Sequence, residues 1–206
     1  MRVDPNDAAF QYFEKSEFEE PVPRKVYVDR TIYESQGMIM PASDGQPTLC
    51  DLGEARFGQD TYTDLIQPVQ YRAPEVILCI PWTYSADVWN LGLVAWNMIE
   101  NKHLFTGEDE QGEESDGHHL AQMVAALGPP PASILARSAN ASQYFDESGK
   151  MCSEIETTVV TLEASTSKVE GDEKAIFLDF IRKMLCWVPE ERQSAAQLLQ
   201  DPWLNS

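Results

Sequence analysis

Cysteine and histidine are scarce in this sequence of 206 residues, which contains four of the former and three of the latter. No two cysteines form a C-x-x-C pair, and no histidine stands at metal-ligand spacing from any of them. The sequence therefore shows none of the usual cysteine and histidine metal signatures. We predict reduced, mostly buried thiols at the four positions, Cys50, Cys79, Cys152 and Cys186.

Basic residues are also few, because 15 lysines and arginines stand against 34 aspartates and glutamates, for a formal net charge of -19. Such a charge repels phosphates, so we do not expect nucleic acid as a partner. A basic protein partner is compatible with it. The charge alone identifies no partner, because excess carboxylate also keeps proteins in solution.

Long apolar runs are missing. The longest, residues 88–99, is interrupted by Asn90 and Asn97 and is too short to span a bilayer. The first five residues lack the apolar run of a secretory signal. With 43% hydrophobic and 24% charged residues, the composition is that of a globular protein. Length and composition thus permit one compact domain, and we expect the protein in the cytoplasm or nucleus, without a membrane partner.

The first part of the chain, residues 1–46, is predicted to be an irregular, partly ordered arm. Four prolines are spread through it, and the run at residues 14–20 is too polar to form a core element. The pattern of β-branched and aromatic residues predicts a short extended pair near residues 26–28 and 31–33.

Two connecting segments follow different patterns. Residues 48–50 indicate a short buried strand that leads into Asp51, and a loop then continues to Gln70. Residues 138–171 form a long polar connection with little periodicity, which in a compact domain suggests an insertion or a surface crossing.

The remaining segments are predicted to be helical. Large apolar side chains on every side of residues 87–100 indicate a helix that is buried all round. Residues 119–127 fit a short amphipathic helix that ends before three consecutive prolines. Helical spacing returns over residues 174–187, and Ser194 is expected to cap a last helix that extends to Leu199.

Four groups of residues occur in an order and spacing typical of one family. They are Asp51-Leu52-Gly53, Tyr71-Arg72-Ala73-Pro74-Glu75, Asp87-Val88-Trp89-Asn90-Leu91-Gly92 and Arg192. Together they resemble the C-terminal lobe of a eukaryotic protein kinase, in which the D-F-G and A-P-E motifs bound the activation segment. Finer details, such as Asp201-Pro202-Trp203-Leu204, are similar to fungal serine/threonine kinases of the SR-protein-kinase type.

The resemblance implies a mainly α fold, a protein-kinase-like C-terminal lobe with a short β element at its start. Residues 1–46 would be the irregular arm that follows the missing catalytic loop, and residues 47–206 a partial kinase domain. The N-terminal lobe and the catalytic loop are absent, because the sequence contains no G-x-G-x-x-G, no Ala-x-Lys and no His-x-Asp. We therefore assign no catalytic residue.

Asp51 matches the family's aspartate that binds the magnesium bridging the ATP phosphates. The resemblance thus implies ATP and Mg²⁺ as cofactors of the parent family, with Asp51 at the metal position. Leu52 replaces the usual phenylalanine and keeps an apolar anchor before Gly53. The alternative is an aspartate with a purely structural place at a strand-to-turn junction.

The resemblance also implies structural roles. Glu75 and Arg192 correspond to a buried ion pair that ties the end of the activation segment to the final helices. Asp87 corresponds to a carboxylate that accepts hydrogen bonds from the catalytic loop, so in its absence either water reaches Asp87 or the arm supplies donors. Trp89 and Gly92 belong to the same central helix. The missing cover predicts an exposed apolar patch on this helix, formed by Trp89, Leu93 and Trp96.

The implied activation segment offers two candidate phosphorylation sites, Thr61 and Thr63. A phosphate there could order the loop by pairing with Arg72. A polar turn without modification fits the same residues. Pro68 stands where these kinases usually place a threonine that touches the catalytic aspartate, and proline offers no hydroxyl.

An acidic loop at residues 107–117 lies near the region that SR-protein kinases use to bind arginine-rich substrates. Carboxylates suit guanidinium groups through paired charge-assisted hydrogen bonds. A solvated acidic loop without a partner is the alternative. The candidate docking residues are Glu108, Asp109, Glu110, Glu113, Glu114 and Asp116.

Two functional hypotheses follow. The first is a truncated serine/threonine kinase domain of the SR-protein-kinase-like type, whose parent phosphorylates serine or threonine in arginine-rich proteins and which is inactive alone. The second is a noncatalytic, pseudokinase-like module that binds a basic protein through its acidic surface. Phosphoryl transfer depends on positioning and charge neutralisation, and most of the parts that provide them are missing.

Overall fold

The computed structural model describes residues 8–35, 37, 49–58, 60–152 and 161–205. The chain falls into two compact units, Met1–Arg56 and Phe57–Ser206, and each is described by itself. Within the described residues, no helix is long and apolar enough to cross a membrane.

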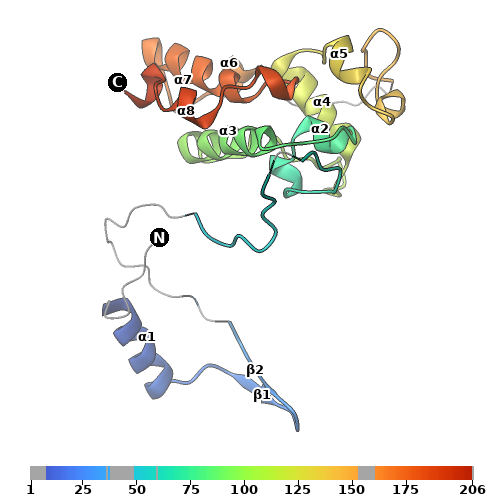
Figure 1. Cartoon of the computed structure of the whole chain (residues 1–206). Helices are drawn as coiled ribbons and strands as arrows, with labels where there is room; N and C mark the ends of the chain where they lie inside the picture. The colour runs from blue at the N-terminus through green and yellow to red at the C-terminus, as the bar shows by residue number, and fades with distance from the viewer. Residues whose placement is uncertain (1–7, 36, 38–48, 59, 153–160, 206) are drawn as a thin grey trace. The chain divides into compact units, whose positions relative to one another are not determined.

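The first unit contains a helix and a β-hairpin (Figure 1). The helix, α1, spans Ala8–Glu19, where we predicted irregular chain, so that prediction is wrong. Its sequence is polar but contains neither glycine nor proline, and Lys15 forms an i,i+4 ion pair with Glu19 at 3.7 Å. A polar composition argues against a core element without preventing a helix.

The hairpin confirms the expected extended pair, with the first strand starting two residues earlier. Strands β1 (Arg24–Val26) and β2 (Thr31–Tyr33) are antiparallel, with Val26 opposite Thr31. Lys25 and Arg30 both lie over the ring of Tyr27, at 5.4 and 5.1 Å from its centroid. These cation–π contacts hold the turn between the strands.

The buried strand predicted just before Asp51 is wrong for the two residues that the structure describes there. Leu49 and Cys50 are exposed and have no regular structure. A strand needs a neighbour, and the described sheet pairs β1 only with β2. Thr48 lies outside the described residues.

The second unit is helical, which confirms the mainly α prediction. Its α-helices are α2 (Pro74–Ile77), α3 (Ser85–Glu100), α4 (Asp116–Leu127), α5 (Ala132–Leu135), α6 (Leu162–Ser165), α7 (Gly171–Met184) and α8 (Ala195–Leu198). Short 3₁₀ turns, η1 (Val69–Tyr71), η2 (Ala141–Gln143), η3 (Pro189–Glu191) and η4 (Pro202–Leu204), connect them. Figure 1 shows α3 lying alongside α7 and α8.

The core is built around one face of α3. Trp89, Leu93 and Trp96 are buried, so the predicted exposed patch at these residues is wrong. Trp96 stacks on Phe177 of α7, with ring centroids 5.9 Å apart. A Cβ on Gly92 would lie 2.9 Å from Cβ of Met184, which explains the glycine at this helix crossing.

The opposite face of α3 is open, so the prediction of a helix buried on all sides is also wrong. Met98 is 78% exposed and Leu91 48% exposed. Apolar residues on every side of a helix show that each face can be buried, but they do not show that a neighbouring element covers each face.

The shorter helices begin and end close to their predicted positions. Ser115 caps α4, which begins three residues earlier than expected, and Gly128 at φ 84° follows its end. The α7 helix stops at Met184, short of residue 187. Ser194 caps α8 with a full capping box in which Gln197 takes part, as its sequence indicated.

The cysteines are free, as expected, but they are not buried. Three are exposed and Cys186 is partly exposed. Each of the three in the second unit lies beside a helix end or a turn rather than in the core. Cys79, for example, adopts a left-handed φ of 53° just after α2. Burial was inferred from residue type alone, and chain position overrides that tendency.

Candidate functional site

The Asp51-Leu52-Gly53 motif lies in the first unit and all three residues are exposed. Asp51 has a φ of 61°, a backbone conformation that non-glycine residues seldom adopt. Within the described residues, no three histidine, cysteine, aspartate or glutamate side chains come together to hold a metal. Asp51 is therefore not part of such a cluster among the described residues, and its place at the metal position stays a prediction.

The candidate phosphorylation sites belong to an exposed stretch of the second unit. Thr61 and Thr63 are both exposed, and they flank Tyr62. The backbone of Tyr62 exchanges two hydrogen bonds with Trp82, at 3.1 and 2.8 Å, and the two rings lie 5.1 Å apart. The Trp82 indole also donates to the carbonyl of Asp64. This stretch is thus tethered to the chain just before α3.

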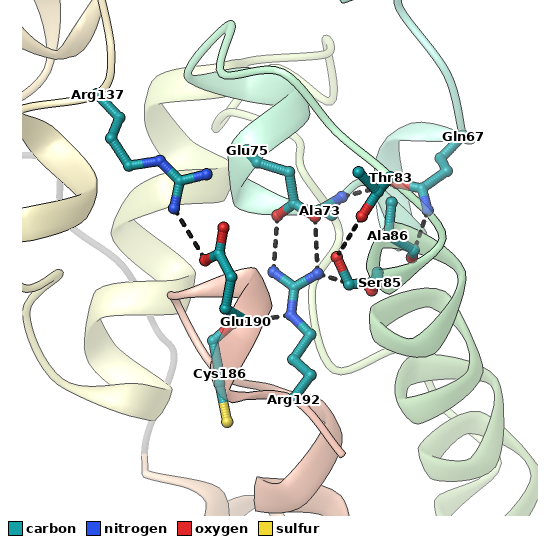
Figure 2. A network of polar contacts seen from close by, with 10 residues as sticks. All are labelled: Gln67, Ala73, Glu75, Thr83, Ser85, Ala86, Arg137, Cys186, Glu190 and Arg192. Carbon is teal, nitrogen blue, oxygen red and sulfur yellow. Dashed lines mark hydrogen bonds and ion pairs between the residues drawn. The ribbon is translucent and has the colours of Figure 1, made fainter. Parts of the chain in front are cut away.

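Gln67 links the residues before α2 to α3, a role that no sequence motif indicates. Its Nε2 donates to the carbonyl oxygen of Ala86 and its Oε1 accepts from the backbone N–H of Ala73, both at 2.8 Å (Figure 2). Its φ of 69° places the residue in the left-handed region. The Gln67 side chain thus joins the segment from Gln67 to Ala73 to α3.

Arg72 connects the same segment to α4. Its guanidinium lies 3.4 Å from the carboxylate of Asp116 and 3.4 Å from the carbonyl oxygen of Gln67. The Arg72 side chain is 11% exposed. Asp116, one of the candidate docking carboxylates, is therefore engaged within the molecule, and Arg72 already has an anionic partner.

Glu75 and Arg192 form the buried ion pair that the resemblance implies (Figure 2). Two hydrogen bonds of 2.7 Å join the guanidinium to the carboxylate, and neither side chain is exposed. Arg192 also donates to the carbonyl oxygens of Ser85 and Cys186 and lies 5.1 Å over the ring of Trp89. Four of the five N–H donors of the Arg192 guanidinium thus have an acceptor. A buried cation requires such pairing.

The pair joins three parts of the chain. Glu75 belongs to α2, where Pro74 occupies the first turn and Ala73 precedes it. Arg192 follows η3 and contacts the start of α3 through Ser85. The Tyr71-Arg72-Ala73-Pro74-Glu75 motif is thereby fixed to both the central helix and the C-terminal region.

Asp87 lies in the first turn of α3 and is exposed. Within the second unit, no described residue forms a hydrogen bond or ion pair with its carboxylate, which is open to water there; donors from the arm remain the other expectation. Partial burial raises the pKa of the Asp87 carboxyl above its ordinary value. The residue lines a groove of about 520 Å³ together with Tyr84, Val88 and Leu91.

The acidic loop is a closed turn. Glu108 and Glu114 form an antiparallel bridge, and the Asp109 carboxylate accepts from the backbone N–H groups of Gln111 and Glu113 at 2.9 and 3.0 Å. Hydrogen bonds from Glu113 first, and from its neighbours, hold the pKa of Asp109 below its usual range. The carboxylates left outward and exposed are those of Glu108, Glu110, Glu113 and Glu114.

His119 of α4 is a buried packing residue. Among the described residues neither ring nitrogen has a hydrogen-bond partner, and the ring lies 5.6 Å from that of Phe105. Burial, with a smaller contribution from nearby Arg72, lowers the pKa of His119 to about 3. The ring is therefore neutral at physiological pH.

Comparison with known proteins agrees with these features. A model of the protein kinase domain family matches residues 37–204. A serine/threonine protein kinase of Aspergillus fumigatus is 45% identical over 202 residues, which cover 97% of this chain and 51% of the relative. The serine/threonine-protein kinase SKY1 of Saccharomyces cerevisiae is 30% identical over 163 residues, 78% of this chain and 22% of that protein.

A third relative, the dual specificity protein kinase lkh1 of Schizosaccharomyces pombe, is 31% identical over 168 residues, 76% of this chain and 23% of its own length. The chain thus spans about half the length of the Aspergillus relative and about a quarter of the other two.

Proposed function

Because the chain belongs to the protein kinase family, we propose that it supplies the C-terminal lobe of a serine/threonine kinase domain similar to the SR-protein kinases. The parent activity is ATP-dependent phosphorylation of serine or threonine in proteins. We place the protein in the cytoplasm or nucleus. Its own contribution is the platform that holds the end of the activation segment.

The Glu75–Arg192 pair is the observation that carries this proposal. A buried bidentate pair between residues far apart in the chain costs a large desolvation penalty and needs several matching acceptors, which Arg192 has. It joins the A-P-E motif to α3 and to the C-terminal region. Gln67 adds a second attachment for the same segment, through Ala73 and Ala86.

We propose further that the chain does not transfer phosphate by itself. Bound Mg²⁺ and ATP would supply the phosphoryl group and neutralise its charge, and Asp51 would be one ligand of the metal. The sequence contains no G-x-G-x-x-G, Ala-x-Lys or His-x-Asp motif to hold the nucleotide or accept the hydroxyl proton. Among the described residues, Asp51 belongs to no cluster of three or more histidine, cysteine, aspartate or glutamate side chains.

The unpartnered carboxylate of Asp87 supports the same proposal. It lines an open groove at the start of α3 and has no donor among the described residues. In the kinase family this position accepts hydrogen bonds from the catalytic loop. The chain presents the acceptor side of that contact without the donors.

A second candidate function rests on the acidic loop. Four exposed carboxylates stand on one closed turn, held by Asp109 from within, in a chain of net charge -19. Such an arrangement suits an arginine-rich protein, either as substrate or as a partner of a noncatalytic module. No step of phosphoryl transfer is needed for this role.

Calorimetric titration of the purified full chain tests both candidates. Mg-ATP is expected to produce no binding heat, and an arginine–serine peptide is expected to bind more tightly than a lysine–serine peptide of equal charge. Substituting Glu110 and Glu113 by glutamine should weaken the peptide, whereas Glu147→Gln, outside the loop, should not. Mg-ATP binding that disappears in Asp51→Ala would overturn the proposal of an incomplete nucleotide site.

A further inference from the structure

The carboxylate of Glu100, at the C-terminal end of α3, is held by two consecutive residues of a distant segment. Its Oε2 accepts from the backbone N–H and the hydroxyl of Ser167, at 2.9 and 2.8 Å, and its Oε1 accepts from the backbone N–H of Lys168 at 3.1 Å. All three residues belong to the second unit. Together they form what we call the α3 latch, which joins the last residue of α3 to the chain between α6 and α7.

The position of Glu100 is unfavourable for a carboxylate apart from these hydrogen bonds. The residue is only 2% exposed, and it ends α3, where the helix dipole disfavours negative charge. Burial alone would raise the pKa of the Glu100 carboxyl, but the hydrogen bonds from Lys168 and Ser167 outweigh it and lower the pKa. The charged form of Glu100 therefore depends on the donors of the latch.

Ser167 is the member of the α3 latch that a modifying enzyme can reach. It is exposed within the second unit, whereas Thr166 before it is buried. Exposed carboxylates occupy three of the six positions that follow it, Glu170, Asp172 and Glu173. An exposed serine followed by acidic residues suits a protein kinase whose substrate groove is basic.

Cations stand close to the α3 latch. Lys168 follows Ser167, and the ammonium group of Lys174 donates to the carbonyl oxygen one residue before Ser167, at 3.1 Å. Lys102 attracts the Glu100 carboxylate electrostatically. Three of the 15 basic residues of the chain thus lie around the latch. A phosphate on the serine would have these lysines as alternative partners.

We propose that Ser167 is a phosphorylation site and that its modification opens the α3 latch. A separate protein kinase transfers the γ-phosphoryl group of ATP to Ser167 Oγ; the new O–P bond forms, the bond to ADP breaks, and the hydroxyl proton passes to a base of that enzyme. The phosphate removes the hydroxyl donor and places about two negative charges against a buried carboxylate. Like-charge repulsion then separates Ser167 and Lys168 from Glu100, and the phosphate pairs with lysine instead.

Hydrogen exchange tests the opening of the latch. The full chain is produced with phosphoserine incorporated at position 167, and exchange of the Ser167 and Lys168 backbone amides is compared with that of the unmodified chain. We expect both amides to exchange at least about tenfold faster, because each loses a hydrogen bond to a charged group. Ser167→Ala, which keeps both backbone donors, is the matched control and should change the rates by less than about threefold. Unchanged rates in the phosphorylated chain would overturn the inference.

Glu100→Gln separates repulsion from simple loss of the hydroxyl. In that background, phosphoserine should accelerate exchange by less than about threefold, because the neutral amide does not repel phosphate. An acceleration as large as in the native background would show that Glu100 does not drive the opening. The comparison of phosphoserine with Ser167→Ala stands without this variant.

Site-resolved mass spectrometry tests the modification itself. The full chain is expressed in Saccharomyces cerevisiae, and we expect phosphate on Ser167 but not on buried Thr166. The phosphate should be lost when the following carboxylates are replaced in Glu170→Gln, Asp172→Asn and Glu173→Gln together. A chain without phosphate on Ser167 would overturn the site, and phosphate that persists in the triple variant would overturn the acid-directed enzyme. None of these results bears on ATP binding or on the acidic loop.

Discussion

Both carboxylate oxygens of Glu75 lie 2.7 Å from the guanidinium nitrogens of Arg192, and neither side chain is reached by solvent. The two residues are 117 positions apart in the chain. A contact of this kind gives α2, α3 and the C-terminal region one shared attachment point. The position of α2 therefore depends on the stability of the second unit.

Removing one member of this pair should be severely destabilising. Glu75→Ala leaves the Arg192 charge buried without its partner, and we expect the free energy of unfolding in urea to fall by about 3–5 kcal/mol. Glu190→Gln, which breaks the exposed pair with Arg137, is the control and should change it by less than about 1 kcal/mol. Equal effects of the two substitutions would contradict the account.

We expect the side chain of Gln67 to stabilise the folded chain and its left-handed backbone conformation to destabilise it. Gln67→Ala removes two hydrogen bonds and should cost about 1–3 kcal/mol. Gln67→Gly removes the same bonds but relieves the left-handed φ of 69°, so it should be less destabilised by up to about 1 kcal/mol. Thermal unfolding of the two variants, with Gln70→Ala as control, measures the difference; an alanine variant as stable as wild type would refute the role.

Gly92 should not tolerate even one added methyl group. In Gly92→Ala the new Cβ would lie 2.9 Å from Met184 Cβ and 3.0 Å from Leu185 Cδ2. Overpacking of this kind costs about 1–3 kcal/mol, of which the helix preference of alanine returns at most about 1. Gly53→Ala, where no atom lies within 4 Å, is the control. The prediction fails if urea unfolding shows Gly92→Ala to be the more stable of the two.

Stability should fall as the pH drops through the range in which His119 would take up a proton. Its pKa is lowered to about 3 in the folded chain, against an ordinary value near 6.5 when unfolded. The unfolded state therefore binds more protons between these values, and stability that is complete above about pH 6.5 declines toward pH 3. The slope approaches about 1.4 kcal/mol per pH unit for this one group.

The charged groups near His119 are Arg72, which opposes protonation, and Asp116 beyond it. Urea unfolding at several pH values from 7.5 to 4.5 should show a smaller decline for His119→Phe than for the wild-type chain. His118→Phe, at the half-exposed neighbouring position, is the comparison. Identical slopes for wild type and His119→Phe would show that the buried imidazole does not oppose protonation.

Local sequence patterns predicted α3, α4, α7 and α8, but not the shorter helices α2, α5 and α6. The capping box at Ser194 and the glycine stop at Gly128 depend on neighbouring residues, so they could be found without a structure. The polarity of Ala8–Glu19 argues against a core element but contains no information against a helix, so the sequence does not predict α1. Which face of α3 is covered depends on elements distant in sequence, and periodicity contains no information about them.

Some residues of the candidate site could likewise be predicted from the sequence, and others could not. The Glu75–Arg192 pair could be expected because both residues belong to motifs shared with kinases. Gln67 could not, since its two bonds reach residues 6 and 19 positions away and its side chain has no motif of its own. Asp109 and Asp116 counted equally with their acidic neighbours in the sequence, and only the structure shows that both are engaged internally.

The most direct test of the account is phosphate transfer from Mg-ATP to an arginine–serine peptide by the purified full chain, with the full-length Aspergillus relative as positive control. We predict incorporation indistinguishable from a reaction without enzyme. Sustained transfer by the chain alone, abolished in Asp51→Ala and retained in Glu147→Gln, would contradict the central claim that this chain is the scaffold of a kinase and not its catalytic centre.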